Sequence, residues 1–280
     1  MISSRVIAGE TAVLGTGRRR SRGWATPAGA LIGAVFLAIG PATKAAAETA
    51  VSCLIACPGG GPATVTLKRP IYTLSVDPGT HLAAWAAYRV TRASIGKSPR
   101  RKWRRDPDLP PAVGLAPRHF KGAHAALGTD RGHLVPLASF AGTGAVQTTN
   151  YLSNIVPQKS ALNRGPWAAL EGAVRRLARR PGVTGVWVQT GPLFERAMAP
   201  LPAGRPGHKV PSGFWKTVAV DTSSGLKLAA FLFDQETVRG ADFCAVRFAL
   251  PLARLERRTG LDLFGAPNPV AGDLRPALGC

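Results

Sequence analysis

The sequence predicts an α+β domain built on a central antiparallel β-sheet. Segments with β-type patterning stand towards both ends of the chain, and one amphipathic helix stands between them. The 280 residues suffice for one large domain with a buried core, or for two small ones. No sequence repeat and no long inner linker divides the part after residue 47, so we expect one domain over residues 48–280.

The expected strands are marked by alternation, β-branched residues and turn signals. They cover residues 63–76 around Pro70, 82–91, 183–190, 214–221 and 226–233. Asp77-Pro78-Gly79 closes the first segment, and Ser223-Ser224-Gly225 would join the last two as a hairpin. Residues 82–91 are apolar enough for a helix as well, but their β-branched end favours a strand.

The clearest helix signal spans residues 161–180. Its apolar stripe consists of Trp167, Leu170, Val174 and Leu177, spaced three or four residues apart. Pro166 is tolerable only in the first turn, and Pro181-Gly182 would end the helix. A shorter helix is expected over residues 251–259, while residues 95–119, rich in Pro and Arg, are expected to form a loop.

Residues 1–47 have the pattern of an export signal. A basic start is formed by Arg18, Arg19, Arg20 and Arg22, an uncharged apolar run covers residues 28–40, and Ala45-Ala46-Ala47 offers a small-residue cleavage site. The apolar run is shorter than the ~20 residues of a membrane-spanning helix and lies between two prolines. A retained membrane anchor is the alternative interpretation.

The chain is strongly basic, with 36 Lys and Arg residues against 15 Asp and Glu and a net charge of +21. Residues 1–47 hold six Lys or Arg residues and one Glu, so their removal leaves a net charge of +16 on the remaining domain. This charge attracts polyanions and leaves nucleic acid, anionic lipid and acidic glycans as candidate partners. A hydrophobic content of 45% with only 18% charged residues excludes a chain disordered by its charge.

All four cysteines, Cys53, Cys57, Cys244 and Cys280, follow the expected cleavage site. An even number of cysteines in an exported chain favours two disulfides. Pairing of Cys53 with Cys57 is sterically plausible and would leave Cys244 to pair with Cys280. A zinc site is the rival interpretation, but no second Cys or His pair stands at zinc-finger spacing in the sequence.

The residues that suggest chemistry begin at Thr129-Asp130-Arg131-Gly132-His133, in which His133 follows an apparent polar turn. Histidine is a natural general base near neutral pH, because its ordinary pKa is about 6.5. Asn163 is expected at or near a helix N-cap, where its amide oxygen would cap the helix or bind a metal. Glu171 and Arg175 stand four residues apart, a spacing that an ordinary surface ion pair explains equally well. Surface or packing roles are expected for the other histidines: His81, His119, His124 and His208.

Together these motifs resemble the DNA/RNA non-specific endonucleases, a family with a ββα-metal (His-Me finger) active site, and within it the secreted Serratia-type nucleases. The resemblance covers nearly all of residues 53–280. It is carried by Asp130-Arg131-Gly132-His133, Asn154-Ile155-Val156-Pro157-Gln158, Asn163, Trp167 and Leu170-Glu171 at the family's spacing. Further similarity lies in residues 190–193, 211–216 and 231–235. It implies an α+β fold whose antiparallel sheet is flanked by helices.

The resemblance also implies a division of labour around one Mg²⁺ ion. His133 would take a proton from the attacking water, and Asn163 would be the one direct protein ligand of the metal. Glu171 would hold metal-bound water. Mn²⁺ in place of Mg²⁺ stays open, since both ions accept oxygen ligands.

Two arginines are implied to contact phosphate and stabilise developing charge, namely Arg175 and Arg101. Arg101 is chosen because it stands two residues before Trp103, but Arg100 in the same basic run, residues 100–105, is a rival. The implied supporting shell consists of Asp130, Arg131, Asn150 and Asn154. Both cysteine pairs match disulfides of the family.

The function implied is that of an exported, Mg²⁺-dependent endonuclease that hydrolyses single- and double-stranded DNA and RNA to 5′-phosphate-ended products. We expect it to be secreted or periplasmic, with DNA and RNA as substrates and without stable membrane association once the signal is removed. The resemblance also implies a homodimer. The alternative is a catalytically inactive, basic extracellular protein that binds nucleic acid.

Overall fold

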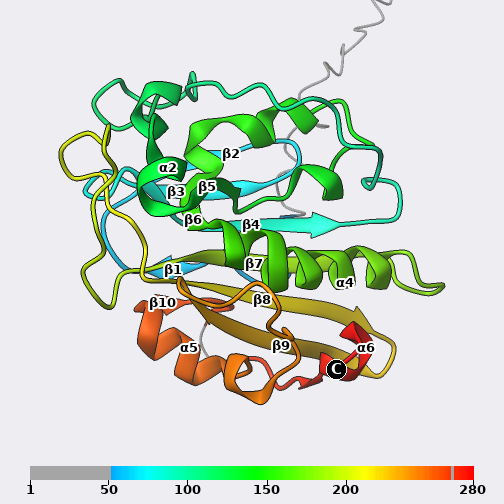
Figure 1. Ribbon diagram of the computed structural model, residues 1–280. Helices are drawn as coiled ribbons and strands as arrows, with labels where there is room; N and C mark the ends of the chain where they lie inside the picture. Colours follow the sequence, from blue (N-terminus) through cyan, green and yellow to red (C-terminus); the bar gives the residue numbers. More distant parts are fainter. Residues whose placement is uncertain (1–51, 266–267) are drawn as a thin grey trace, which may run out of the picture. The chain divides into compact units, whose positions relative to one another are not determined.

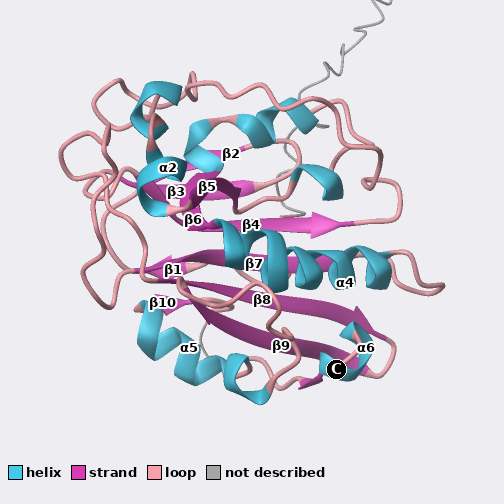
Figure 2. Ribbon diagram, viewed as in Figure 1, coloured by secondary structure: helices cyan, strands magenta, loops and turns pink. Residues whose placement is uncertain are grey.

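A seven-stranded β-sheet forms the centre of the fold (Figures 1 and 2). The computed structural model describes residues 52–265 and 268–280, so the expected export signal lies outside the described residues. In spatial order the strands are β11 (Gly272–Asp273), β9 (Gly225–Asp234), β8 (Gly213–Thr222), β7 (Val186–Leu193), β4 (Leu82–Val90), β3 (Thr73–Asp77) and β2 (Val65–Lys68). Neighbours are antiparallel except for the short β11, which runs parallel to β9.

Two strand pairs and several helices surround this sheet. The pairs are β5 (Thr129–His133) with β6 (Ile155–Lys159), and β1 (Gly59–Gly60) with β10 (Leu261–Asp262). The α-helices are α2 (Ala123–Leu127), α3 (Ser160–Leu162), α4 (Ala168–Ala178), α5 (Leu252–Thr259) and α6 (Arg275–Leu278). Short 3₁₀ turns are η1 (Pro117–Phe120), η2 (Leu137–Ser139), η3 (Val146–Asn150), η4 (Leu152–Asn154) and η6 (Val246–Phe248), and η5 (Asn163–Trp167) is π-helical. The predicted α+β class is confirmed.

Alternation along the strands separates two hydrophobic cores, one on each face of the sheet. On β8, Phe214 and Val218 belong to the core that includes α4 residues such as Val174. The intervening Trp215 belongs to the second core, which includes Leu255 of α5. The period-2 alternation of a strand therefore places α4 and α5 on opposite faces of the sheet.

Most of the predicted strands are confirmed with small shifts of their ends. The ambiguous segment 82–91 is a strand, and β8 and β9 form the expected hairpin, with Thr222 paired to Gly225. Both expected disulfides are present, Cys53 with Cys57 and Cys244 with Cys280. Within the part of the chain that is described, no helix has the length and apolarity needed to cross a membrane.

The predicted continuous helix over residues 161–180 is wrong in its first part. The regular helix α4 begins only at Ala168, because the backbone at Gly165 leaves the helical region, with φ −106° and ψ −116°. The chain passes Arg239 closely at this point, so a Cβ on Gly165 would lie 2.3 Å from the Arg239 carbonyl oxygen. Pro166 therefore follows a break in the helix and does not lie in the first turn of one continuous helix.

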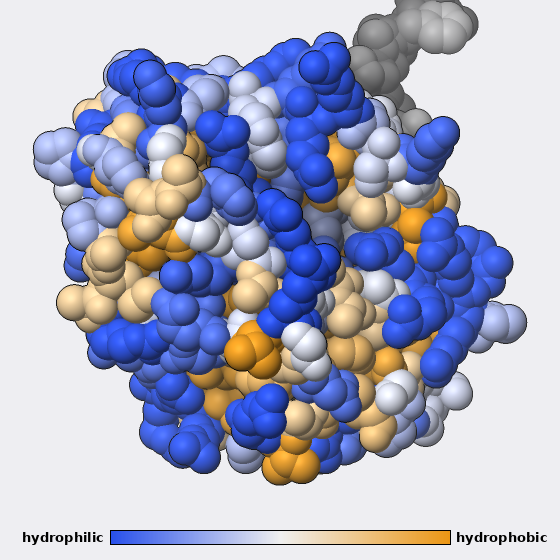
Figure 3. All heavy atoms as spheres, in the orientation of Figure 1, coloured by the Kyte–Doolittle hydropathy of each residue, from blue (hydrophilic) through white to orange (hydrophobic). Residues whose placement is uncertain are grey.

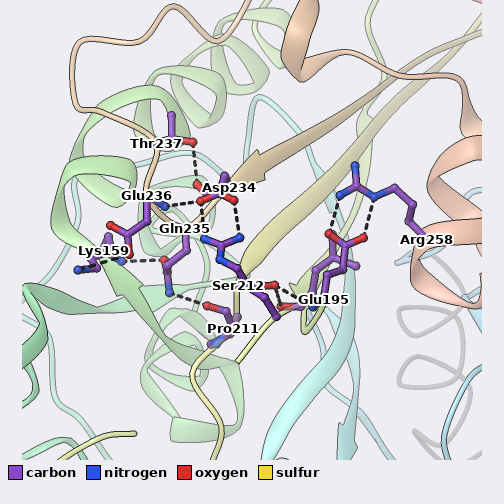
Figure 4. A network of polar contacts seen from close by, with 11 residues as sticks. Lys159, Glu195, Pro211, Ser212, Asp234, Gln235, Glu236, Thr237 and Arg258 are labelled. Atoms are coloured by element: carbon purple, nitrogen blue, oxygen red, sulfur yellow. Dashed lines mark hydrogen bonds and ion pairs between the residues drawn. The ribbon is translucent and has the colours of Figure 1, made fainter. Parts of the chain in front are cut away.

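A buried glutamine joins the β5–β6 pair to the main sheet (Figure 4). Gln235, at the end of β9, accepts a hydrogen bond from the Lys159 backbone N–H at 2.9 Å and donates to the carbonyl of Pro157 at 3.0 Å. Its amide also donates to the carbonyl of Pro211 at 3.1 Å. Its neighbour Asp234 pairs with Arg196 at 2.6 Å. One side chain thus connects β6 and the segment before β8 to the end of β9.

Candidate active site

Seven of the nine predicted site residues line one cleft of about 950 Å³ beside α4, and the other two, Asn150 and Asn154, are buried behind it. Its lining includes His133 from β5, Asn163 from η5, Glu171 and Arg175 from α4, and Arg101 from the basic run of residues 100–105, called the basic loop below. Asp130 and Arg131 line it as well. The cleft therefore gathers a histidine, oxygen donors and arginines.

The β5–β6 pair places His133 at the edge of the cleft. Residues 129–133 form a strand paired with residues 155–159, so the expected polar turn before His133 is wrong. Gly132 lies over the buried Gln158, and a Cβ there would stand 2.6 Å from its Oε1 and 2.8 Å from its Cβ. Glycine is therefore required for β5 to pass this close to β6.

A hydrogen bond to Asn150 orients the His133 ring. The Asn150 amide nitrogen donates to the Gln147 side chain at 3.1 Å, which turns its Oδ1 towards Nε2 of His133 at 3.3 Å. Nε2 then carries the proton, and Nδ1 is left as the basic atom. Burial lowers the pKa of His133 to about 4, the positive charge of Arg101 adds to this, and the Asn150 bond opposes it. The ring is therefore neutral at pH 7, as a general base must be.

An aromatic residue that the sequence analysis did not assign to the site, Trp103, forms its wall. The Trp103 and His133 rings lie 5.2 Å apart. The guanidinium of Arg131 lies 5.6 Å from the Trp103 ring and 5.8 Å from the ring of Phe120. A tryptophan within a basic run is the sequence signal that could have identified this residue, because such rings attract arginine.

The basic loop is held beside the site by its backbone. The Arg104 N–H donates to the Asn150 carbonyl at 3.2 Å, and the Leu152 N–H donates to the Arg104 carbonyl at 2.9 Å. This short bridge fixes the loop next to the partner of His133. Arg101 lines the cleft, whereas Arg100 is not among its lining residues, and this geometry favours Arg101 over its rival.

Asp130 orients the side chain of Asn163. The Asn163 amide nitrogen donates to Asp130 Oδ2 at 2.9 Å, and Arg164 binds both oxygens of the same carboxylate at 2.6 and 2.8 Å. Burial opposes ionisation of Asp130, but these hydrogen bonds outweigh it and hold its pKa below the usual value. Asn163 lies within η5 with helical dihedrals, so the N-cap expectation is wrong.

Glu171 and Arg175 approach each other at 4.0 Å, and their side chains are only 14% and 21% exposed. They are therefore not a solvated surface pair. Burial raises the pKa of Glu171, an effect that the positive charges of Lys216 and Arg175 oppose. Nη1 of Arg175 is buried without a hydrogen-bond partner in the described residues.

Lys216 lies in the core behind α4 and was not identified from the sequence. Its side chain is fully buried, and Nζ lies 3.2 Å from the Tyr88 hydroxyl and 4.1 Å from the centre of the Trp167 ring. Burial lowers the pKa of Lys216 to about 8, while Glu171 opposes the shift. Trp167 itself is in the core, as its place in the predicted apolar stripe implies, and it does not line the cleft.

Asn154 has a structural place in this arrangement. It is fully buried, and its amide accepts from the Val135 N–H at 2.9 Å and donates to the Val135 carbonyl at 3.0 Å. It donates further to the Thr149 carbonyl at 2.9 Å. Asn154 thus joins the segment after His133 to the turn that carries Asn150.

Comparison with known proteins identifies the family. The profile of the DNA/RNA non-specific endonucleases matches residues 55–269. The chain belongs to this family. It is 44% identical over 239 residues to a nuclease of Serratia marcescens, a match that covers 84% of this chain and 89% of the relative. A nuclease of Syncephalastrum racemosum is 30% identical over 84% of each chain, and human mitochondrial endonuclease G is 32% identical over 76% of this chain and 73% of its own.

A solved structure agrees with this membership at the level of the fold. A crystal structure of an EndoG/EndoGI complex, concerned with EndoG inhibition, aligns with a TM-score of 0.61 at 23% identity. The alignment covers 72% of this chain and 86% of that one.

The cleft of this family member suits a hard divalent cation. The oxygen donors that line it include the Asn163 amide, oriented by Asp130, and the Glu171 carboxylate. Across residues 52–265 and 268–280, no three His, Cys, Asp or Glu side chains gather into a metal-binding group. Amide and carboxylate oxygens are the kind of donor that hard divalent cations prefer.

Proposed function

We propose that this chain is an exported endonuclease that hydrolyses DNA and RNA, single- and double-stranded, with one Mg²⁺ ion, and leaves 5′-phosphate ends. The observation that carries the proposal is the convergence of a neutral His133 and the oriented Asn163 on one arginine-lined cleft. Family membership supports the nuclease activity. Residues 1–47 would be the removed export signal, and residues 48–280 the catalytic domain.

His133 acts as the general base in this proposal. Nδ1 accepts a proton from the attacking water, while the Nε2–H bond to Asn150 Oδ1 holds the ring and stabilises the imidazolium that forms. A neutral ring is ready to accept the proton at pH 7, which is consistent with its low pKa.

Asn163 would hold the metal directly, and Glu171 would hold the water around it. When bound, Mg²⁺ would neutralise negative charge on the phosphate oxygens and would lower the pKa of water, so that this water can protonate the leaving oxygen. Asp130 and Arg164 keep the Asn163 amide oriented through their hydrogen bonds. Mn²⁺ would satisfy the same oxygen donors.

Arg175 and Arg101 would bind the scissile phosphate and stabilise the charge that develops on it. A guanidinium offers paired donors that match phosphate oxygens. Such contacts address the nucleic-acid backbone, so they recognise no base sequence and suit both DNA and RNA.

The test is digestion of circular single-stranded DNA, plasmid DNA and RNA by the purified chain, in Mg²⁺ and in EDTA. Cleavage of the circular substrates in Mg²⁺ alone, and its loss in His133→Ala, is the expected result. Kinase labelling of the products only after phosphatase treatment would identify 5′-phosphate ends. Intact substrates in Mg²⁺ and in Mn²⁺ would overturn the enzyme assignment. Retained DNA binding would then favour the inactive binding protein.

A further inference from the structure

Two arginine side chains converge at the border of the cleft, over a glycine of α4. A Cβ on Gly172 would lie 3.4 Å from Nη1 of Arg176 and 3.9 Å from Nη2 of Arg175. Both guanidinium groups therefore approach the same bare point on the helix, one residue after Glu171. Arg175 lines the cleft and Arg176 is exposed, so this point lies at the border between the cleft and the open surface of α4.

Among the described residues, no acidic side chain pairs with Arg176 or with the Nη2 of Arg175 that faces Gly172. The ion pair that Arg175 does form is its 4.0 Å approach to Glu171, which involves Nη1. Two like charges that share one point repel each other, and an anion placed between them removes the repulsion. A phosphate matches the paired donors of guanidinium groups.

The basic surface continues along the helix to its end. Arg179 and Arg180 are exposed, and the Arg92 side chain donates to the Arg179 carbonyl. We call Arg176, Arg179, Arg180 and Arg92 the α4 ridge. Hydrophilic side chains gather towards the right edge in Figure 3, where α4 ends in Figure 1.

The favourable position of cations at a helix C-terminus does not account for the whole ridge. The macrodipole favours positive charge in the last turn. Arg180, however, lies beyond the last helical residue, Ala178, and its charge adds to that of Arg176 and Arg179 at this end of the helix, where like charges repel one another. A polyanion lying along the helix would convert this repulsion into attraction.

We propose that Arg175 and Arg176 form a second phosphate-binding subsite over Gly172, and that the α4 ridge beyond it carries the flanking strand of the nucleic-acid substrate. This rests on the proposed function and extends it to the length of substrate that the protein contacts. From Glu171 to its last residue, Ala178, α4 rises about 10 Å. At about 3.4 Å per nucleotide step of a duplex, this corresponds to roughly three nucleotides beyond the cleft.

The opposite face of the sheet offers a charge-matched control. Arg254 and Arg257 on α5 are exposed and carry the same charge as Arg176 and Arg180, but α5 packs against the other face. Both pairs are replaced by glutamine, which preserves helix propensity. The ridge variant is Arg176→Gln with Arg180→Gln, and the control is Arg254→Gln with Arg257→Gln.

Binding is measured by fluorescence anisotropy in a His133→Ala background, so that the substrate is not cut. The probes are a labelled 24-base-pair duplex and a labelled dinucleotide, whose single internal phosphate fills only the scissile position, each titrated over a range of NaCl concentrations. The ridge variant is expected to bind the duplex several-fold more weakly, with the slope of log K against log salt reduced by about 1.8, as for two lost phosphate contacts. Its dinucleotide affinity and both affinities of the control should match the parent.

A second variant, Gly172→Leu, keeps every charge and fills the space between the two guanidinium groups. It should weaken duplex binding as well, while thermal unfolding confirms that the helix is intact. The proposal is overturned if the ridge and control variants bind the duplex equally, or if ridge substitution weakens dinucleotide binding as much as duplex binding. Cleavage of plasmid by the His133-containing protein is assayed in parallel. If the ridge variant binds the duplex as well as the parent does but plasmid is still cleaved, only the proposed role of the α4 ridge is contradicted. If plasmid is not cleaved, the proposed function is contradicted.

Discussion

The Asn163 amide nitrogen donates to the Asp130 carboxylate at 2.9 Å, which directs the opposite side of the amide, its oxygen, away from Asp130. The orientation of the proposed metal ligand is therefore set by a residue 33 positions earlier in the chain. Arg164 binds the same carboxylate through two nitrogens and keeps it in place.

Asp130→Asn should weaken metal-dependent cleavage by roughly 10- to 100-fold, the usual cost of losing a partner that orients a ligand. A neutral amide loses the charge that binds Arg164 and can present its own N–H₂ to Asn163. The Mg²⁺ concentration for half-maximal plasmid cleavage should rise, and far-UV circular dichroism should stay unchanged. An unaltered Mg²⁺ dependence would show that Asp130 does not orient the ligand.

Asn150→Asp should shift the acid limb of the pH–rate profile to higher pH. A carboxylate 3.3 Å from Nε2 would favour the imidazolium and raise the pKa of His133 from about 4. Because the base must be neutral, activity would then be lost at a higher pH than in the parent. The measurement is kcat/KM against pH, with the His133 titration followed by NMR in the metal-free protein. Coincident profiles would contradict the proposed role of Asn150.

Lys216→Met should reduce activity most at low pH. Burial raises the pKa of Glu171, and Lys216 is the leading charge that opposes it, so its loss leaves more Glu171 protonated. Below the raised pKa the ionised fraction falls about tenfold per pH unit. Lys216→Arg, which keeps the positive charge, is the control. If Lys216→Met is folded and its profile matches the parent, charge on Lys216 is irrelevant to Glu171.

His208→Phe should protect the fold against acid. His208 is 5% exposed, its ring nitrogens lack hydrogen-bond partners in the described part of the chain, and burial lowers its pKa to about 4. The unfolded chain therefore takes up the proton first as pH falls, and the unfolding free energy declines between about pH 6.5 and pH 4, by up to about 3 kcal/mol.

Urea unfolding in EDTA at pH 7 and pH 4.5 checks this, with His124→Gln at an exposed site as control. Phenylalanine at position 208 keeps the edge-on ring contact with Phe120, 5.4 Å between centroids, without a titrating group. An equal loss of stability in parent and variant would assign the acid sensitivity elsewhere.

Much of the main sheet follows from local sequence, whereas the β5–β6 pair does not. β8 and β9 show apolar stretches bounded by turn residues, so their pairing could be predicted. Thr129–His133 is short, polar and contains glycine, which resembles a turn. It becomes a strand because its backbone pairs with β6, and β6 in turn is held by Gln235, 76 residues after Lys159.

The family motif in the sequence identifies the site residues, but it does not predict how their side chains are arranged. The spacing predicts that Asn163 caps a helix. In the structure the helix is broken at Gly165, where the chain passes close to Arg239, and the Asn163 amide donates a hydrogen bond to Asp130. Lys216 lies in an apolar strand pattern, and only the folded structure shows that its charge faces Trp167. Contacts between distant segments leave no local signal, which is why these features were missed.

The two disulfides make the stability of this chain depend on its redox surroundings. Cys244 and Cys280 are 36 residues apart in sequence. Linking them lowers the conformational entropy of the unfolded chain and thereby raises the free energy of unfolding by about 4 kcal/mol. A domain has only about 5–15 kcal/mol of stability in total, and neither bond persists in a reducing compartment. A reduced copy is therefore nearer to unfolding and more open to proteolysis. Closure of the Cys244–Cys280 bond thus decides how much of the folding free energy this chain keeps when it is diluted, heated or exposed to proteases.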